Sequence, residues 1–282
     1  MMIFRIIRVE LIKIRKRQAP WIMLGLFLIS IAFYFLAVSS LADANPETTQ
    51  ADSMRLREGM RFPNGYDGLL QTTFRIGTIL AVIFASLLTG SEYSWGTLRQ
   101  VLSRGIPRTY FLVGKLVAIF FSLFIAMLIT LFFGTGFMLA GDMIRGTIDF
   151  TLSDDFGWTI TTDSLRVTMI LIVYACIGFA ASVITRSSAA GLGAGALFVF
   201  AEVLIFSALS ILGGFWAELS HYAVYRLADD VLMANKFGQS SDFAGDWSFS
   251  PDWAAAILFL YIAILMVITF ITFSRRDLKG AA

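Results

Sequence analysis

The sequence predicts an all-α integral membrane protein with six transmembrane helices. Of the 282 residues, 57% are hydrophobic and only 15% are charged, and the apolar residues form long blocks that a soluble core does not need. Several blocks approach the ~20 residues with which a helix crosses a bilayer. Only helices satisfy their backbone groups within one such segment. The composition therefore excludes a soluble enzyme and a disordered chain.

Six apolar blocks mark the predicted spans of a single membrane domain that covers residues 20–282. Charged or turn-forming residues separate most of the blocks. The third block is longer than a span requires, which indicates a tilt or first turns outside the lipid. The predicted spans are residues 20–41, 68–90, 111–140, 165–185, 189–212 and 253–273.

The distribution of lysine and arginine predicts that both termini are cytoplasmic, in the cell (plasma or inner) membrane. Cytoplasmic segments retain positive charge, and fourteen of the 22 basic residues fall on one side of the predicted spans. Acidic residues concentrate in the opposite loops. The fourteen residues are Arg5, Arg8, Lys13, Arg15, Lys16, Arg17, Arg99, Arg104, Arg108, Lys115, Arg186, Arg275, Arg276 and Lys279.

The first span also has features of a secretory signal peptide, because Ala42-Asp43-Ala44 follows a basic stretch and an apolar run. The run is longer than an ordinary signal core, and cleavage would leave five spans with termini on opposite sides. We therefore expect this segment to remain as a span.

Residues 1–19 predict an amphipathic helix that lies in the membrane interface, with its basic face towards anionic headgroups. Pro20 is expected to end this helix before the first span. The alternative is a positively charged topology signal without a docked helix. Ile3, Ile7, Leu11 and Ile14 share the apolar face, with Phe4 and Ile6 at its margins. Arg5, Arg8, Arg15 and Lys16 share the basic face, and Val9, Glu10 and Ile12 interrupt the pattern.

The predicted cytoplasmic loop 91–110 contains a second, shorter amphipathic pattern. Leucines at Leu98 and Leu102 recur at helical spacing, and Gly105 and Pro107 mark the end of the helix. A connector between two membrane helices needs only a few polar residues. We therefore expect the two leucines to be exposed and covered by another protein.

The residues of this loop resemble those of the ABC-type-2 permease family, and the resemblance extends to the end of the chain. The matching positions are Glu92, Gly96-Thr97-Leu98-Arg99, Leu102, Pro107-Arg108, Lys115 and Ser274-Arg275-Arg276-Asp277. The resemblance implies that the short helix is a coupling helix that docks on a cytoplasmic ABC ATPase subunit. The alternative is an ordinary basic inner loop. The expected coupling residues are Glu92, Tyr93, Gly96, Thr97, Leu98, Arg99, Leu102, Pro107 and Arg108.

The sequence offers no catalytic motif of its own. Gly114-Lys115-Leu116 lacks the first glycine and the hydroxyl of a phosphate-binding loop, so ATP and Mg are expected on the partner ATPase. Cys176 and His221 are the single cysteine and histidine, which leaves a thiol zinc site or a Ser-His-Asp triad without its parts. We expect no enzyme activity, no cofactor or metal bound by this chain, and no nucleic-acid partner.

The function expected from the resemblance is the permease subunit of an ATP-driven exporter. It would form the translocation path as a dimer with a second copy or a paralogue, in contact with membrane lipids, and an amphipathic export substrate is favoured. The alternatives are a secondary transporter driven by an ion gradient and a membrane assembly scaffold.

Two ionisable residues within the spans are candidate path-lining residues or a buried pair. Arg75 lies ~10 Å into the second span and Glu202 ~15 Å into the fifth, and a lone charge near the bilayer centre costs roughly 2.5–3.5 kcal/mol. The resemblance implies that these two spans line the path. The alternatives are an Arg75 side chain that reaches the headgroups and a neutral Glu202 hydrogen-bonded between helices.

Gly191 and Gly195 form a Gly-x-x-x-Gly motif near the start of the fifth span. Small residues let helix backbones approach closely in lipid. The motif predicts a helix-packing site, either a crossing within the chain or the seam between two protomers.

Overall fold

The computed structural model describes residues 2–44, 57–103, 105–146, 154–232 and 249–275, and these residues form helices and no strand. The helices are α1 (Met2–Lys16), α2 (Gln18–Ala44), α4 (Tyr66–Ser94), α5 (Thr97–Ser103), α6 (Arg108–Arg145), α7 (Phe156–Thr185), α8 (Ser188–Leu212), α9 (Phe215–Ser220), α10 (Val224–Leu232) and α11 (Pro251–Arg275).

Six helices in this part of the chain, α2, α4, α6, α7, α8 and α11, are long and apolar enough to cross a membrane. The prediction of an all-helical, six-span membrane protein is therefore confirmed. The largest difference is at α7, which begins at Phe156 and not at residue 165. Its first turns contain Thr161 and Asp163, which lower the hydropathy. The Thr161 hydroxyl donates to the Gly157 carbonyl of its own helix (2.7 Å). This polar side chain is therefore satisfied within the helix, and the helix can begin before the apolar block.

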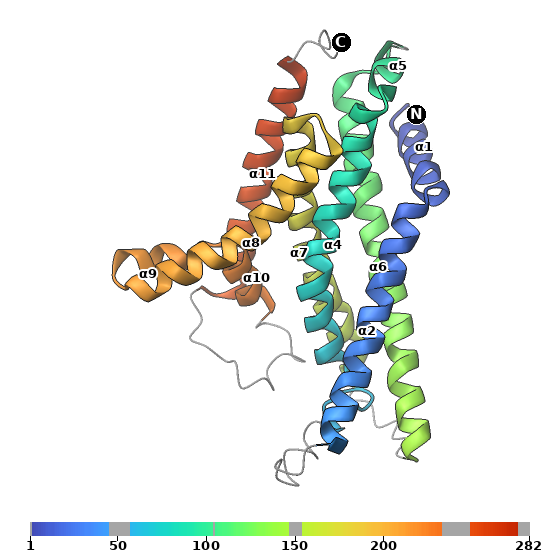
Figure 1. Cartoon of the computed structure of the whole chain (residues 1–282), viewed down its shortest axis with the longest axis vertical. Coiled ribbons are helices and arrows are strands. Elements are labelled where there is room, and N and C mark those ends of the chain that lie inside the picture. Colours follow the sequence, from blue (N-terminus) through green and yellow to red (C-terminus); the bar gives the residue numbers. More distant parts are fainter. Residues whose placement is uncertain (1, 45–56, 104, 147–153, 233–248, 276–282) are drawn as a thin grey trace.

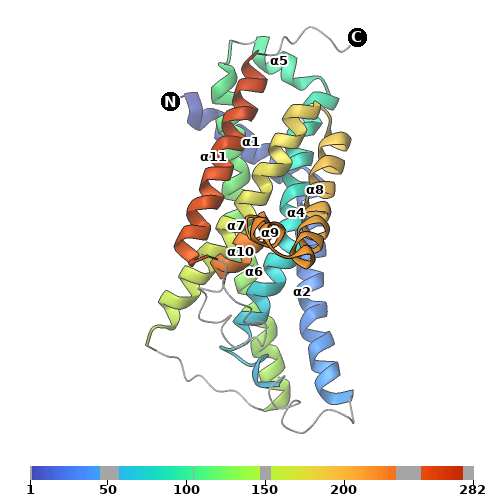
Figure 2. The ribbon, with the colours of Figure 1, turned by 90° about the vertical axis from the view of Figure 1, so that its left-hand side faces the viewer.

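The bundle has two central helices, α4 and α7, which are more buried than the other spans. Figure 1 shows α1, α5 and the last turn of α11 at one end of the bundle, which we call the α5 end. From that end α8 runs obliquely outwards, so that α9 projects from the side of the molecule at about mid-height (Figures 1 and 2). The short helix α10 returns to the bundle at the same level.

The two glycines of the Gly-x-x-x-Gly motif serve a helix crossing within the chain. A Cβ atom on Gly191 would lie 2.6 Å from the Cα atom of Ser182 in α7, and one on Gly195 would lie 2.6 Å from the Val82 side chain in α4. The Ser182 hydroxyl also donates to the Ser86 carbonyl of α4 (3.1 Å). Close backbone approach thus joins α4, α7 and α8.

The break between α1 and α2 lies at Arg17, since α1 ends at Lys16 and α2 begins at Gln18. The expectation that Pro20 ends the first helix is therefore wrong. Pro20 lies in the first turn of α2, where the missing N–H would have no intrahelical partner in any case.

The buried face of α1 lies at the margin of the predicted apolar face and includes Glu10, which the prediction had placed outside the pattern. Ile6 and Glu10 are its buried residues within the described side chains, and Ile6 packs against Gly114 of α6. Glu10, which interrupts the apolar pattern, therefore points into the protein. Its burial requires compensating charges from other helices.

Candidate functional site

Four charged side chains from three helices form a buried network at the α5 end. Glu10 and Lys13 come from α1, Glu92 from the last turn of α4, and Lys115 from the start of α6. The Lys115 ammonium lies 2.8 Å from Glu10 Oε2 and 3.0 Å from Glu92 Oε1. The Lys13 ammonium lies 2.5 Å from Glu10 Oε1 and 2.9 Å from Glu92 Oε1. We call these four residues the charge network.

The charge network is neutral overall and mostly shielded from solvent. Glu10, Glu92 and Lys115 are buried, whereas the Lys13 side chain is 33% exposed. Lys115 also donates to the Leu88 carbonyl (3.2 Å). Buried charges are costly unless paired and hydrogen-bonded. Their mutual pairing is therefore a condition for seating α1 on α4 and α6.

Charge pairing also determines the protonation of the two α1 residues in the network. Burial alone would raise the pKa of Glu10, but the ammonium groups of Lys115 and Lys13 outweigh burial and hold this pKa below its ordinary value. Burial alone would lower the pKa of Lys13, but the carboxylates of Glu10 and Glu92 outweigh it and raise that pKa. Both residues are therefore charged at neutral pH.

Arg17 supplies a second connection between the α1–α2 junction and the end of α4. Its Nη1 donates to the Ser91 hydroxyl (2.7 Å), and its guanidinium lies 4.7 Å from the ring centroid of Trp95. Such a cation–π contact is favourable by ~0.5–1 kcal/mol at an exposed site. The junction is thus fixed to the start of loop 91–110.

The first expected coupling residues connect loop 91–110 to the bundle. Glu92 belongs to the charge network, and Tyr93 packs against the apolar core. Gly96 has a φ of 65°, a left-handed conformation that glycine adopts readily. The Thr97 hydroxyl then donates to the Glu92 carbonyl (3.4 Å).

The expectation that Leu98 is exposed is wrong. Leu98 is only 4% exposed and belongs to the apolar core that includes Phe111. The turn at Gly96 precedes α5, so the first turn of this helix faces the bundle and its leucine packs inside. Arg99 and Leu102 lie within α5, but their side chains are outside the described part of the structure.

The other end of the loop is joined to α11. Pro107 precedes the first residue of α6, and Arg108 donates to the carbonyl oxygens of Ser274 (2.9 Å) and Phe273 (3.5 Å). Among the side chains of this region that the structure describes, the large exposed hydrophobic ones are Trp95, at 65%, and Tyr110, at 47%.

The structure does not join Arg75 to Glu202. Within the described residues, no ion pair connects the two side chains: Arg75 is exposed, whereas Glu202 is 3% exposed. Glu202 Oε1 instead accepts a hydrogen bond from the backbone N–H of Tyr225 (3.1 Å). The two residues lie at a similar predicted depth, but the Arg75 side chain is on the surface of the protein and the Glu202 side chain is buried. Burial raises the pKa of Asp229 in α10, and the Arg75 guanidinium opposes that rise.

The sequence analysis missed the partner of Glu202, which is the first turn of α10. Val224, Leu227, Ala228 and Val231 of this helix are buried in one apolar cluster with residues of α7 and α11. Their spacing of three, four and seven residues is a helical pattern. That pattern was the available signal, but α10 has only nine residues and lies between the last two predicted spans.

Metal-binding groupings are absent from the residues that the structure describes: no three His, Cys, Asp or Glu side chains lie together in a way that could hold an ion. The charge network contains two carboxylates, but each is neutralised by lysine. The arrangement is therefore suited to attaching helices and not to metal chemistry.

The six long apolar helices indicate a multi-pass, all-helical membrane protein. The chain belongs to the DUF2705 family, whose description is "protein of unknown function" and whose model matches residues 27–279. A comparison with curated proteins finds no match.

Proposed function

We propose that the chain is the transmembrane permease subunit of an ATP-driven ABC exporter, which works as a dimer with a separate cytoplasmic ATPase. The proposal includes α1 as an interfacial helix and both termini on the cytoplasmic side. It is supported by the resemblance of residues 92–115 and 274–277 to ABC-type-2 permeases.

The observation that carries the proposal is the charge network. Glu92 is at once the first expected residue of the coupling loop and a direct partner of Lys13 and Lys115. A displacement of the loop would therefore be transmitted to α1, α4 and α6 together. A permease driven by an external ATPase needs such a connection between its contact loop and its spans.

The ATPase contact is proposed to include Trp95, in place of Leu98. Tryptophan is enriched among residues that dominate binding energy at protein interfaces, and this indole is exposed beside the first turn of α5. Arg17 holds the ring from the α1 side. Leu98→Asp would place a charge in the core and would not isolate the contact.

The test is to co-express the chain with any ABC ATPase that a neighbouring gene encodes, and to measure copurification and ATP hydrolysis in vesicles. Trp95→Asp is expected to reduce both by at least about tenfold, the equivalent of 1.4 kcal/mol. Trp158→Asp is the matched control, because Trp158 is 72% exposed at the start of α7, away from the α5 end.

Normal copurification and hydrolysis in the Trp95→Asp variant would contradict the assigned contact. If no ATPase copurifies with the unaltered chain and transport follows an imposed ion gradient, the secondary-transporter alternative would replace the exporter proposal.

A further inference from the structure

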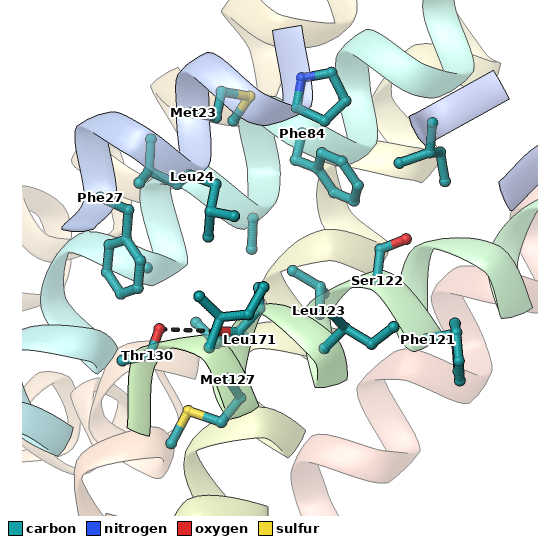
Figure 3. A pocket seen from close by; sticks show the side chains of 18 of the residues that line it. Met23, Leu24, Phe27, Phe84, Phe121, Ser122, Leu123, Met127, Thr130 and Leu171 are labelled. Atoms are coloured by element: carbon teal, nitrogen blue, oxygen red, sulfur yellow. Dashed lines mark hydrogen bonds between the residues drawn. The ribbon is translucent and has the colours of Figure 1, made fainter. Parts of the chain in front are cut away.

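A cavity of 380 Å³ lies between α1, α2, α4, α6 and α7. Figure 3 shows Leu24 and Phe27 of α2 on one side of it, and Leu123 and Met127 of α6 on the other. Leu11 and Ile14 of α1 also contribute to the lining. The cavity therefore begins beneath α1 and extends along the bundle between spanning helices. Its volume falls within the ~300–1,000 Å³ typical of ligand pockets.

The wall offers a polar solute no free hydroxyl donor. Three hydroxyl residues, Thr73, Ser122 and Thr130, line the cavity, but each donates to a carbonyl oxygen of its own helix. These hydrogen bonds measure 2.7 Å to Leu69, 2.8 Å to Ala118 and 2.9 Å to Ala126. The rest of the lining is apolar apart from Arg15. Such a wall favours a hydrocarbon chain.

The single cation of the lining marks one end of the cavity. Arg15 is exposed, and its carbonyl accepts a hydrogen bond from the Trp21 indole N–H (2.9 Å). This hydrogen bond joins the end of α1 to the first turn of α2. A guanidinium group binds phosphate oxygens through a planar pair of N–H donors, and basic groups beside membrane helices recognise anionic headgroups.

The surrounding medium contains a molecule with both required parts. Protein interiors are close-packed, whereas α2 buries little of its apolar surface against the rest of the bundle. The resulting space lies among membrane helices, where acyl chains are the adjacent solvent. An anionic phospholipid combines a chain for the cavity with a phosphate for Arg15.

We propose that this cavity binds one acyl chain of an anionic phospholipid, whose phosphate pairs with Arg15. The site is separate from the ATPase contact and does not depend on the transport proposal. The bound acyl chain would fill the space between α2 and α6.

The test measures lipid binding to the detergent-purified full chain by native mass spectrometry. The probes are phosphatidylglycerol and phosphatidylcholine with identical acyl chains. Ala126→Trp fills the cavity from α6 and is expected to weaken the binding of phosphatidylglycerol by at least about tenfold. Ala140→Trp is the control, because Ala140 is an exposed alanine of the same helix outside the lining.

The headgroup contact is tested by Arg15→Gln, with Arg5→Gln as the control on the same helix. Arg5 is exposed and does not line the cavity. Arg15→Gln is expected to remove the preference for phosphatidylglycerol over phosphatidylcholine, whereas Arg5→Gln is expected to preserve it. An unchanged preference in Arg15→Gln would overturn the proposal.

Unaltered phosphatidylglycerol binding in a folded Ala126→Trp variant would also overturn the proposal. If that variant does not fold, Ser122→Leu places a smaller apolar group into the same cavity and is measured in its place. If Ala126→Trp or Ser122→Leu removes the mass of the dimer and leaves lipid binding unchanged, the cavity is a contact with a second copy of the chain. That result would overturn the lipid assignment.

Discussion

Glu202 of α8 accepts a hydrogen bond from the backbone N–H of Tyr225, with 3.1 Å between Oε1 and the nitrogen. This N–H belongs to the first turn of α10, where backbone N–H groups have no partner within the helix. A carboxyl group is also favoured there by the helix dipole. A buried residue of a spanning helix thus fixes the start of a short helix that lies between α8 and α11 in the chain.

Replacing Glu202 tests this attachment of α10. Glu202→Leu is expected to lower the free energy of unfolding by about 1–2 kcal/mol, as for the loss of a helix cap. Glu202→Gln is expected to lose less, because its amide oxygen can still accept from Tyr225. Thermal unfolding in detergent measures both. Glu218→Leu, at an exposed position of α9, is the control, and an equal loss in that variant would contradict the capping role.

A double-mutant cycle tests the absence of an Arg75–Glu202 pair. Arg75→Met and Glu202→Gln are expected to be additive within about 0.3–0.5 kcal/mol. Burial raises the pKa of Asp229 to about 6, and the guanidinium groups of Arg75 and Arg226 oppose that rise. Arg75→Met should therefore couple to Asp229→Asn. Strong coupling of Arg75 to Glu202 in the unfolding measurements would instead restore the pair.

The charge network predicts a rescue between two of its members. Lys115→Met leaves Glu92 and Glu10 without their shared buried cation, and breaking such a pair typically costs about 3–5 kcal/mol. Adding Glu92→Gln should recover much of this loss, because Glu10 and Lys13 remain paired. Arg145→Met, at the exposed far end of α6, is the control for the unfolding measurement. A double variant no more stable than Lys115→Met would argue against the network.

The network also predicts how stability depends on pH. The pKa of Glu10 is lowered from 4.5 on folding, so its stabilisation is present above pH 4.5 and is lost as the pH falls through the folded value. The pKa of Lys13 is raised from 10.5, so its contribution is present below pH 10.5 and is lost as the pH rises further. The unfolding temperature should therefore fall more steeply on acidification in the unaltered chain than in Glu10→Gln. Identical acid profiles would refute the role of Glu10.

Replacement by alanine is expected to change stability in opposite directions at two glycines of α8. Gly191→Ala would bring a Cβ atom to 2.6 Å from the Ser182 Cα atom, whereas Gly193→Ala meets nothing within 4 Å. The first is expected to cost about 1–3 kcal/mol through overpacking. The second is expected to be neutral or to stabilise by up to about 1 kcal/mol through helix propensity. Thermal unfolding separates them, and equal effects would contradict the crossing.

The spans could be predicted from sequence because a bilayer imposes a length and a composition on each helix. The start of α7 was not predicted, because its first turns are polar and hydropathy does not detect them. The Thr161 hydroxyl is satisfied by a carbonyl of its own helix, so the helix can continue through polar residues. Hydropathy therefore locates the lipid-facing part of a helix better than its ends.

The candidate site was less predictable because its contacts depend on helix rotation and on chain-distant partners. Glu10 interrupted an apolar pattern, and the lysine that explains its burial, Lys115, lies 105 residues away. Leu98 had the correct helical spacing, but the turn at Gly96 directs it into the core. The predicted depth of Glu202 in its span likewise could not show whether its partner is the Arg75 side chain or the Tyr225 backbone N–H.

The pairing within the charge network has a consequence for the attachment of α1. Two contacts cross the boundary between α1 and the bundle, Lys13–Glu92 and Lys115–Glu10, whereas Glu10–Lys13 and Glu92–Lys115 lie on either side of it. If α1 lifted away, each half would keep one acid and one base together, so neither would carry a lone ion. Separation of α1 would break the two crossing contacts and keep the other two, and its return would form the crossing contacts again at constant charge. The N-terminal helix can therefore detach from the bundle without leaving an unpaired charge on either side.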